Sequence, residues 1–437
     1  MNTNNKYGTY SVRPVSDFPV SDSPLPDVTL MAAFEEAYLD CLRKKSMTAS
    51  ALRFRVDETA ELTRLALEVE RGEYVPLPSR AFVVHRPVPR EIIAARFRDR
   101  IAEHYMVMRL RPLAERMLPD GAYSCRDGRG NLAAVFRLRD ELLRASRGYT
   151  RPCWVARYDL RAFFMSIDRR RLYEDFVRLI EDGYDGDDRD TLLYLTRIIT
   201  LTCPADRAER RCPRWEWDAV ERGKSVWDLP WHCGLAIGNL PSQLGANVEN
   251  APHLRLLESV GLPAVNYVDD FSHAVTDREA FLALMSYMRG WLKDERGLTL
   301  HPRKFYLQPA DRGVKFLGSV VKGDRVYIGN RVVHSLFSKV RWHNTVLGAT
   351  AALRRRHAER FANLLNSYLG LMRHFRTCNI RRRAAEEVLA VWADCISFSP
   401  DFGRATAAPR CRSLDRARHR AGREHREDLL FLKTNLL

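Results

Sequence analysis

Two stretches decide the fold, WVARYDL at residues 154–160 and AVNYVDDFSHAV at residues 264–275. Both are rich in β-branched and aromatic residues, which favour strands. In the second stretch Asp269 and Asp270 interrupt the alternation, so we predict a strand, a tight turn and a second strand. Asp159 lies at the end of the first stretch. The pattern therefore predicts a hairpin with two carboxylates at its tip and a third carboxylate at a strand end.

Carboxylates on rigid strand ends are suited to Mg²⁺, which prefers oxygen ligands and keeps several of its waters. Two such ions can clamp the attacking and leaving oxygens when a nucleotide is transferred. We therefore predict that Asp159, Leu160, Asp269 and Asp270 form a site for two Mg²⁺ ions, with Mn²⁺ as an alternative. An ordinary aspartate-rich turn is the competing interpretation.

Two phenylalanines follow the first strand, in LRAFFMSID at residues 160–168. A polymerase that selects deoxynucleotides needs an aromatic side chain under the sugar, where it excludes a 2′-hydroxyl. Phe164 is our candidate, and Phe163 is the alternative. Plain core packing must hold for one of the two.

A glycine-containing segment, GLAIGNLPSQLGANVEN at residues 234–250, precedes the hairpin. Gly234 and Gly238 allow the backbone to approach a ligand closely. Ser242, Gln243 and Asn247 are then expected to contact template or nucleotide from a following helix.

In this order, the three segments resemble motifs A, B and C of reverse transcriptases. RPVPREIIAARFRDRIAEHYM and YSCRDGRGNLAAV resemble the first two conserved blocks of that family, HPRKFYL resembles motif D, and VKFLGSVV resembles motif E. Together they cover roughly residues 81 to 390. The resemblance implies an α+β right-hand polymerase fold with fingers, a palm with an antiparallel sheet, and a helical thumb.

The resemblance also assigns roles to individual residues. Lys304 corresponds to the motif D lysine, a candidate general acid for pyrophosphate. Arg126 and Tyr267 are placed beside the nucleotide. Phe316, Leu317 and Gly318 correspond to the primer grip. The implied activity is RNA-directed DNA synthesis from deoxynucleotide triphosphates on template RNA with a primer or cDNA end.

The run IGNLPSQ at residues 237–243 is similar to the bacterial enzymes of diversity-generating retroelements. That group implies misincorporation opposite template adenines and a small, basic, helical accessory protein as partner. Ile237 stands where accurate relatives often have glutamine, and its aliphatic side chain cannot hydrogen-bond a nucleotide. A packing role for Ile237 is the alternative. Ala236, Pro241 and Gly245 depart from the group's pattern, so an antiphage-defence or retron-like enzyme is the second candidate, and an inactive RNA-binding scaffold is the third.

Apolar spacing predicts helices at 30–45, 57–71, 90–110 and 131–146, a strand at 81–88, and a second hairpin at 314–329 with KGD at its turn. The domains follow from these elements and from shifts in composition. They are an N-terminal arm (1–28), N-terminal helices and fingers (29–150), a palm (151–330) with an insertion (181–232), a thumb (331–400) and a basic tail (401–437).

The chain is basic, with a formal net charge of +16 and a pI near 9.6, which favours a polyanionic partner. Residues 331–383 contain twelve Lys and Arg residues but one acid, Glu359. This predicts a thumb that follows the phosphates of template and primer through Arg354, Arg355 and Arg356. A solvated helix face is the alternative, although such faces usually mix signs.

Several classes of protein fit the sequence poorly. No apolar run approaches the roughly 20 residues of a membrane span, and the N-terminus lacks a signal-peptide pattern. Nine scattered cysteines favour reduced thiols and a cytoplasmic location. A zinc site of Cys203, Cys212, His232 and Cys233 is the alternative, but its spacing matches no standard pattern.

Overall fold

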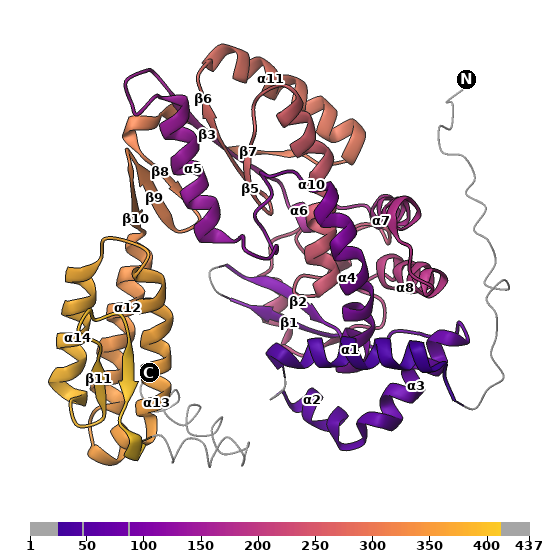
Figure 1. Ribbon diagram of the computed structural model, residues 1–437, viewed down its shortest axis with the longest axis horizontal. Coiled ribbons are helices and arrows are strands. Elements are labelled where there is room, and N and C mark those ends of the chain that lie inside the picture. The colour runs from indigo at the N-terminus through magenta and orange to yellow at the C-terminus, as the bar shows by residue number, and fades with distance from the viewer. Residues whose placement is uncertain (1–24, 46–47, 86–87, 412–437) are drawn as a thin grey trace. The chain divides into compact units, whose positions relative to one another are not determined.

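The computed structural model describes residues 25–45, 48–85 and 88–411 (Figure 1). Helices alternate with small sheets whose strand pairs are antiparallel, except for β1 with β4, so the α+β prediction is confirmed. The chain forms two compact units, which are described separately below. Of the described residues, the first unit comprises those from 25 to 134 and from 154 to 307, and the second comprises those from 135 to 153 and from 308 to 411.

A four-stranded sheet in the order β5-β6-β3-β7 organises the first unit. Its strands are β3 (Trp154–Leu160), β5 (Val265–Tyr267), β6 (Asp270–Val275) and β7 (Leu300–Pro309). Strands β5 and β6 form the predicted hairpin, and β3 is the predicted strand that ends in the first aspartate.

Helices from distant parts of the chain share one core with this sheet. Tyr158 of β3 and Phe271 of β6 stack with a centroid distance of 5.0 Å, and His253 packs beside both rings. The contributing helices are α4 (Phe97–Met117), α6 (Phe163–Ser166), α7 (Arg169–Gly183), α10 (Leu240–Ser259) and α11 (Arg278–Trp291). Side-chain caps begin two of them: Asp168 accepts from the N–H of Arg170 in α7, and Asp277 caps α11 in the same way.

Three N-terminal helices build a second cluster against α4, and α8 joins it. They are α1 (Val28–Lys45), α2 (Ala49–Phe54) and α3 (Glu58–Glu70), and α8 spans Arg189–Leu201. The predicted helices at 30–45 and 57–71 are thereby confirmed. Short turns of helix follow at Arg55–Asp57 and Leu292–Arg296.

The predicted helix at 90–110 is wrong at its start. Arg90–Ala94 forms strand β2, which pairs with β1 (Arg80–Val84), and helix α4 begins only at Phe97. In β2 burial alternates from residue to residue, because Ile93 faces the core with a strand period of two rather than a helical period. Strand β4 (Glu209–Arg210) extends this sheet from within the 181–232 insertion, where α9 (Arg214–Asp218) and a turn at Val226–Asp228 also lie.

The second unit holds α5 (Asn131–Ala145), as predicted, although the boundary between the units falls within its first turn. Residues 314–329 form three strands rather than one hairpin, because Leu317 (φ 46°) and Gly318 (φ 79°) make an additional tight turn. The strands are β8 (Val314–Phe316), β9 (Ser319–Lys322) and β10 (Arg325–Ile328). The KGD turn joins β9 to β10, as predicted.

The C-terminal helices of this unit pack around Phe361 and Trp392, whose rings lie 4.9 Å apart. The elements are α12 (Asn330–Trp342), α13 (Ala351–Met372), α14 (Cys378–Trp392), β11 (Ile396–Phe398) and β12 (Ala405–Ala407), with short turns at Ala310–Arg312 and His343–Leu347. Residues 1–24 of the predicted arm and 412–437 of the predicted tail lie outside the described residues. In the described part of the chain no helix is long and apolar enough to cross a membrane.

Candidate active site

The hairpin brings its aspartates against the end of β3. In the antiparallel register Asp159 pairs with Asp270, and the N–H of Leu160 donates to the carbonyl of Asp269 at 3.1 Å. Two carboxylates from the neighbouring strands β3 and β6 and a third from the hairpin turn therefore meet at one end of the sheet, as the sequence predicted. Leu160 lies with them and is almost fully buried.

The turn between β5 and β6 is strained, and two buried asparagine side chains stabilise it. Val268 has a φ of 59°, which is unusual for a β-branched residue. The side-chain amides of Asn250 and Asn266 both donate to its carbonyl, at 2.6 and 2.9 Å, and both residues are fully buried. These two bonds fix the turn, and with it the direction in which the neighbouring carboxylates point.

The carboxylates influence one another electrostatically. Burial, together with the negative charges of Asp159 and Asp270, raises the pKa of Asp269 to about 6, while the charge of Lys304 opposes this shift. A buried carboxyl beside two like charges is a place where a cation would be stabilised. All of these groups belong to the first unit.

Two basic side chains occupy the site. Lys304 of β7 donates through Nζ to Oδ2 of Asp159 at 2.7 Å, and Arg157 of β3 donates through Nη2 to Oδ1 of Asp270 at 2.8 Å. The sequence predicted Lys304 but missed Arg157. The strand period could have identified it, since Arg157 lies two residues before Asp159 and therefore on the same face.

As the side chains lie, no three His, Cys, Asp or Glu residues among those described are arranged to hold a metal ion. This applies equally to the zinc alternative, and all nine cysteines are free thiols. The donor set at the sheet end is nonetheless of carboxylate and carbonyl oxygens, the chemistry that Mg²⁺ prefers. Asp159 and Asp270 would have to release Lys304 and Arg157 before they could face a shared ion.

The two candidate gate residues differ in exposure. Phe163 is buried, whereas Phe164 is half-buried, and their rings meet edge to face at 5.8 Å. Ala162, with a φ of 47°, turns the chain just before them. Phe163 thus packs in the core, which leaves Phe164 as the better candidate for a ligand contact.

The glycine-containing segment lies against the residues that follow β3. The N–H of Leu235 donates to the carbonyl of Phe164 at 2.9 Å, and that of Gly234 donates to Ile167 at 3.0 Å. Phe164 and Ile237 pack against the same small apolar cluster. Gly238 has a φ of 109°, a conformation that only glycine adopts readily.

Helix α10 follows this segment and carries the predicted polar residues. Gln243 is half-buried, while Ser242 is buried. The expectation that Asn247 contacts template or nucleotide is wrong for this conformation. Its amide is buried and bonded to Ser124, donating to the carbonyl at 2.8 Å and accepting from the hydroxyl at 2.5 Å.

Arg126 is engaged within the protein. Its Nε donates to Glu115 at 2.7 Å, and its Nη1 donates to the carbonyls of Pro119 and Ala122 at 3.0 Å each. In this arrangement the guanidinium holds the segment between α4 and α5, and its contact with a nucleotide stays a prediction. Tyr267, at the end of β5, is half-buried opposite Asp270, and burial raises its pKa.

The residues predicted to bind nucleic acid lie in the second unit. Phe316 is buried, whereas Leu317 is half-buried and Gly318 is exposed at the β8–β9 turn. Arg354 donates to Asp394 at 3.1 Å and to the carbonyl of Gly348 at 2.8 Å. Arg355 is exposed at the start of α13, next to the half-buried Arg356.

Comparison with known proteins gives matches among solved structures alone. No family model and no curated protein matches the chain. Telomerase from Candida albicans in complex with the TWJ fragment of telomeric RNA is 10% identical, with a TM-score of 0.39, over 83% of this chain and 67% of that chain. Apo telomerase from Candida tropicalis is 9% identical, with a TM-score of 0.43, over 81% and 68%. Telomerase from Candida tropicalis in complex with the TWJ fragment of telomeric RNA is 10% identical, with a TM-score of 0.42, over 83% of this chain and 65% of that chain.

Proposed function

We propose that the protein is an RNA-directed DNA polymerase whose active site is the end of the four-stranded sheet. One observation carries the proposal. Asp159, Asp269 and Asp270 lie together at a strand end and a strained hairpin tip, and Lys304 reaches the same carboxylates. Polymerisation needs carboxylates on rigid strands together with a proton donor near the leaving group.

Asp159, Asp269 and Asp270 would hold the ions, with the backbone of Leu160 beside them. Two bound Mg²⁺ ions, or Mn²⁺ in their place, supply charge stabilisation for the attacking 3′-oxygen and the leaving pyrophosphate. Before any ion binds, Lys304 would neutralise Asp159 and Arg157 would neutralise Asp270. Once Lys304 leaves Asp159, its Nζ is free to donate a proton to pyrophosphate, which is the general-acid role predicted for it.

The remaining predicted residues would select and align the substrate. Phe164 would lie under the deoxyribose, and Ile237, Gly238 and Gln243 would flank the nascent base pair. The second unit would bind the template RNA and the primer or cDNA end. Arg355 and Arg356 lie near the N-terminal end of α13, whose first turn contains no acidic residue, so a phosphate there would meet both the side chains and the positive end of the helix dipole.

Primer extension on an RNA template tests this assignment. Asp269→Asn should abolish Mg²⁺-dependent extension, because a neutral amide cannot replace the carboxylate, while the circular dichroism spectrum stays unchanged. Asp187→Asn, at an exposed aspartate, is the matched control and should extend normally. Extension by Asp269→Asn at the rate of the control would exclude a catalytic role for this hairpin.

The finer proposal is error-prone synthesis opposite template adenines, as in a diversity-generating retroelement, with a small helical accessory protein as partner. It rests on the run at residues 237–243 and on Ile237 within it. An accurate antiphage-defence or retron-like enzyme is the alternative among enzymes, and a catalytically silent RNA-binding scaffold is the alternative outside them. The assay of Asp269→Asn separates the scaffold from the enzymes, and the fidelity measurement described below separates the two enzymes.

A further inference from the structure

The first unit contains a cavity of about 240 Å³ away from the aspartates. Residues 74–77, helices α4 and α8, and the segment from Leu235 to Ser242 line it. Its apolar walls include Ile93, Leu172 and Phe176. Such a mixture of apolar walls with a few polar groups is typical of small-molecule sites.

Three polar side chains on its lining each have at least one hydrogen-bonding atom without a partner among the described residues. Glu103 is 7% exposed and makes no hydrogen bond to any described residue; burial raises its pKa to about 8. Thr200, 5% exposed, has an unpartnered Oγ1, and Arg169, 2% exposed, has an unpartnered Nε. A buried polar group without a partner is costly, so each of them favours a ligand that supplies one.

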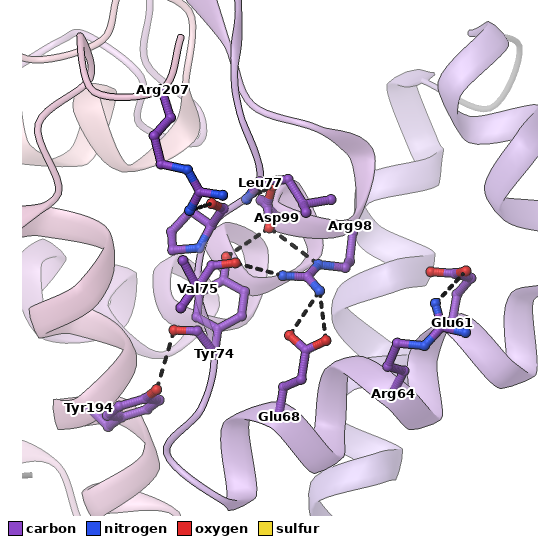
Figure 2. A network of polar contacts seen from close by, with 11 residues as sticks. Glu61, Arg64, Glu68, Tyr74, Val75, Leu77, Arg98, Asp99, Tyr194 and Arg207 are labelled. Atoms are coloured by element: carbon purple, nitrogen blue, oxygen red, sulfur yellow. Dashed lines mark hydrogen bonds and ion pairs between the residues drawn. The ribbon is translucent and has the colours of Figure 1, made fainter.

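Figure 2 shows the polar contacts made by residues 74–77, which line one side of the cavity. Asp99 accepts from the hydroxyl of Tyr74 at 3.1 Å and from the N–H of Leu77 at 3.0 Å. Arg98 donates to the carbonyl of Val75 at 2.9 Å and to both carboxylate oxygens of Glu68. Asp99 and Arg98 therefore bond to each other and to the 74–77 backbone, whereas Glu103 accepts no hydrogen bond from a described residue and has the charge of Arg100 acting on it.

We propose that this cavity binds a small planar heterocycle of the 2-aminopyrimidinone type. Two adjacent N–H groups of such a ring match the two oxygens of Glu103 in its ionised form, which hydrogen bonds from the ligand would stabilise against burial. Its carbonyl can accept from the Thr200 hydroxyl or the Arg169 guanidinium, and its faces can pack against the apolar walls. The site is separate from the proposed polymerase chemistry, but its ligand would contact the segment that carries Ile237 and Gly238.

Binding to the full chain can be measured without any activity assay. The probe is isocytosine, followed by calorimetry and by ligand-observed NMR, and 4-pyrimidinone, which lacks the amino group, is the matched ligand. Isocytosine should bind at least about tenfold more tightly than 4-pyrimidinone, since one N–H to the carboxylate is lost. Glu103→Gln should remove most of this preference, and Thr200→Val should weaken binding several-fold. Glu36→Gln, at an exposed carboxylate on α1, should bind as the wild type does.

Glu103→Gln and Thr200→Val preserve side-chain shape, and their thermal midpoints would show whether each variant is folded. Equal affinity of wild type and folded Glu103→Gln for isocytosine would overturn the proposal, as would equal affinity of the wild type for the two rings. Failure of isocytosine to bind the wild type would overturn it too. None of these results bears on polymerase activity, so the two proposals stand or fall separately.

Discussion

Phe164 is a half-buried ring that follows the carboxylate strand and is hydrogen-bonded through its carbonyl to the glycine-containing segment. We expect Phe164→Ala to raise incorporation of ribonucleotides relative to deoxynucleotides by roughly tenfold or more, because the steric exclusion of the 2′-hydroxyl is removed. Single-nucleotide extension with each type of substrate measures it. Tyr287→Ala, at an exposed aromatic on α11, is the control. Unchanged selectivity would assign the gate to another residue.

Ile237 bears on fidelity. A glutamine at this position could hydrogen-bond the nucleotide and penalise a poorly placed pair, and such a bond contributes roughly 0.5–1.5 kcal/mol, or up to about tenfold in error rate. We expect the wild type to misincorporate frequently opposite template adenine and Ile237→Gln to reduce this error. Sequencing of cDNA made on a defined RNA, with any accessory protein supplied, measures both. Uniformly low wild-type error at all four template bases would favour the defence or retron-like alternative.

At the level of single residues, the sequence predicted the charged residues of the site better than the residues that position them. Asp159, Asp269, Asp270 and Lys304 were predicted and lie together. Asn250 was missed, because its function is to bond a carbonyl in a turn 18 residues away, a contact that depends on how α10 packs beside the hairpin. Asn247 was predicted to contact a ligand because its true partner, Ser124, is likewise distant in sequence and depends on the packing of α10.

Among the elements, strands that end in charged residues were predicted well and short apolar runs were not. The segment REIIAARF at residues 90–97 fits both periods, because Ile93 and Phe97 are four residues apart, as on one face of a helix, and also suit a strand followed by a helix. Pairing with β1 makes residues 90–94 a strand, and the partner residues 80–84 lie outside the segment whose spacing was read. Tertiary pairing therefore overrides the helical spacing.

Helix α13 gives a prediction at the scale of an element. Arg355→Ala with Arg356→Ala should weaken binding to an RNA–DNA duplex and reduce the slope of log affinity against log salt by roughly 0.7–0.9 for each lost phosphate contact. Arg354 is left unchanged, because its bonds to Asp394 hold the helix in place. Arg43→Ala, at an exposed arginine on α1, is the control. A salt slope equal to that of the control would assign these arginines to a different partner.

For the whole molecule, the mixed α+β fold that the resemblance implied is confirmed. The division into compact units was harder to foresee, because residues 135–153 belong with residues 308–437 rather than with their neighbours in sequence. Helix α5 shows why: its Phe136 stacks with Phe375 at 6.4 Å, a contact across more than half of the chain. No local pattern encodes such a partner.

The core of the first unit also predicts how stability depends on pH. His253 and His273 are fully buried around the hydroxyl of Tyr158, with Nε2 distances of 3.1 and 3.3 Å. Burial lowers the pKa of His253 to about 3, helped by the charge of His273, and lowers that of His273 to about 4. Both values lie below the ordinary 6.5 of the unfolded chain. The unfolded state therefore binds protons first, and the stability contributed by each neutral histidine is lost as the pH falls below 6.5.

Glu103 gives the stability of the fold the opposite dependence on pH, over an overlapping pH range. Its raised pKa, about 8, favours the folded state at low pH, and this contribution is lost as the pH rises from 4.5 to about 8. The contribution of a histidine must therefore be measured as the difference in the free energy of unfolding between a variant and the wild type. We expect the free energy of unfolding of His273→Gln, relative to wild type, to improve by about 2 kcal/mol between about pH 7.5 and about pH 5, because glutamine does not titrate. Urea unfolding at the two pH values measures it, with Glu103→Gln expected to shift in the opposite sense. A difference between His273→Gln and wild type that does not change with pH would mean that His273 has the same pKa in the folded core as in the unfolded chain, and it would contradict this prediction.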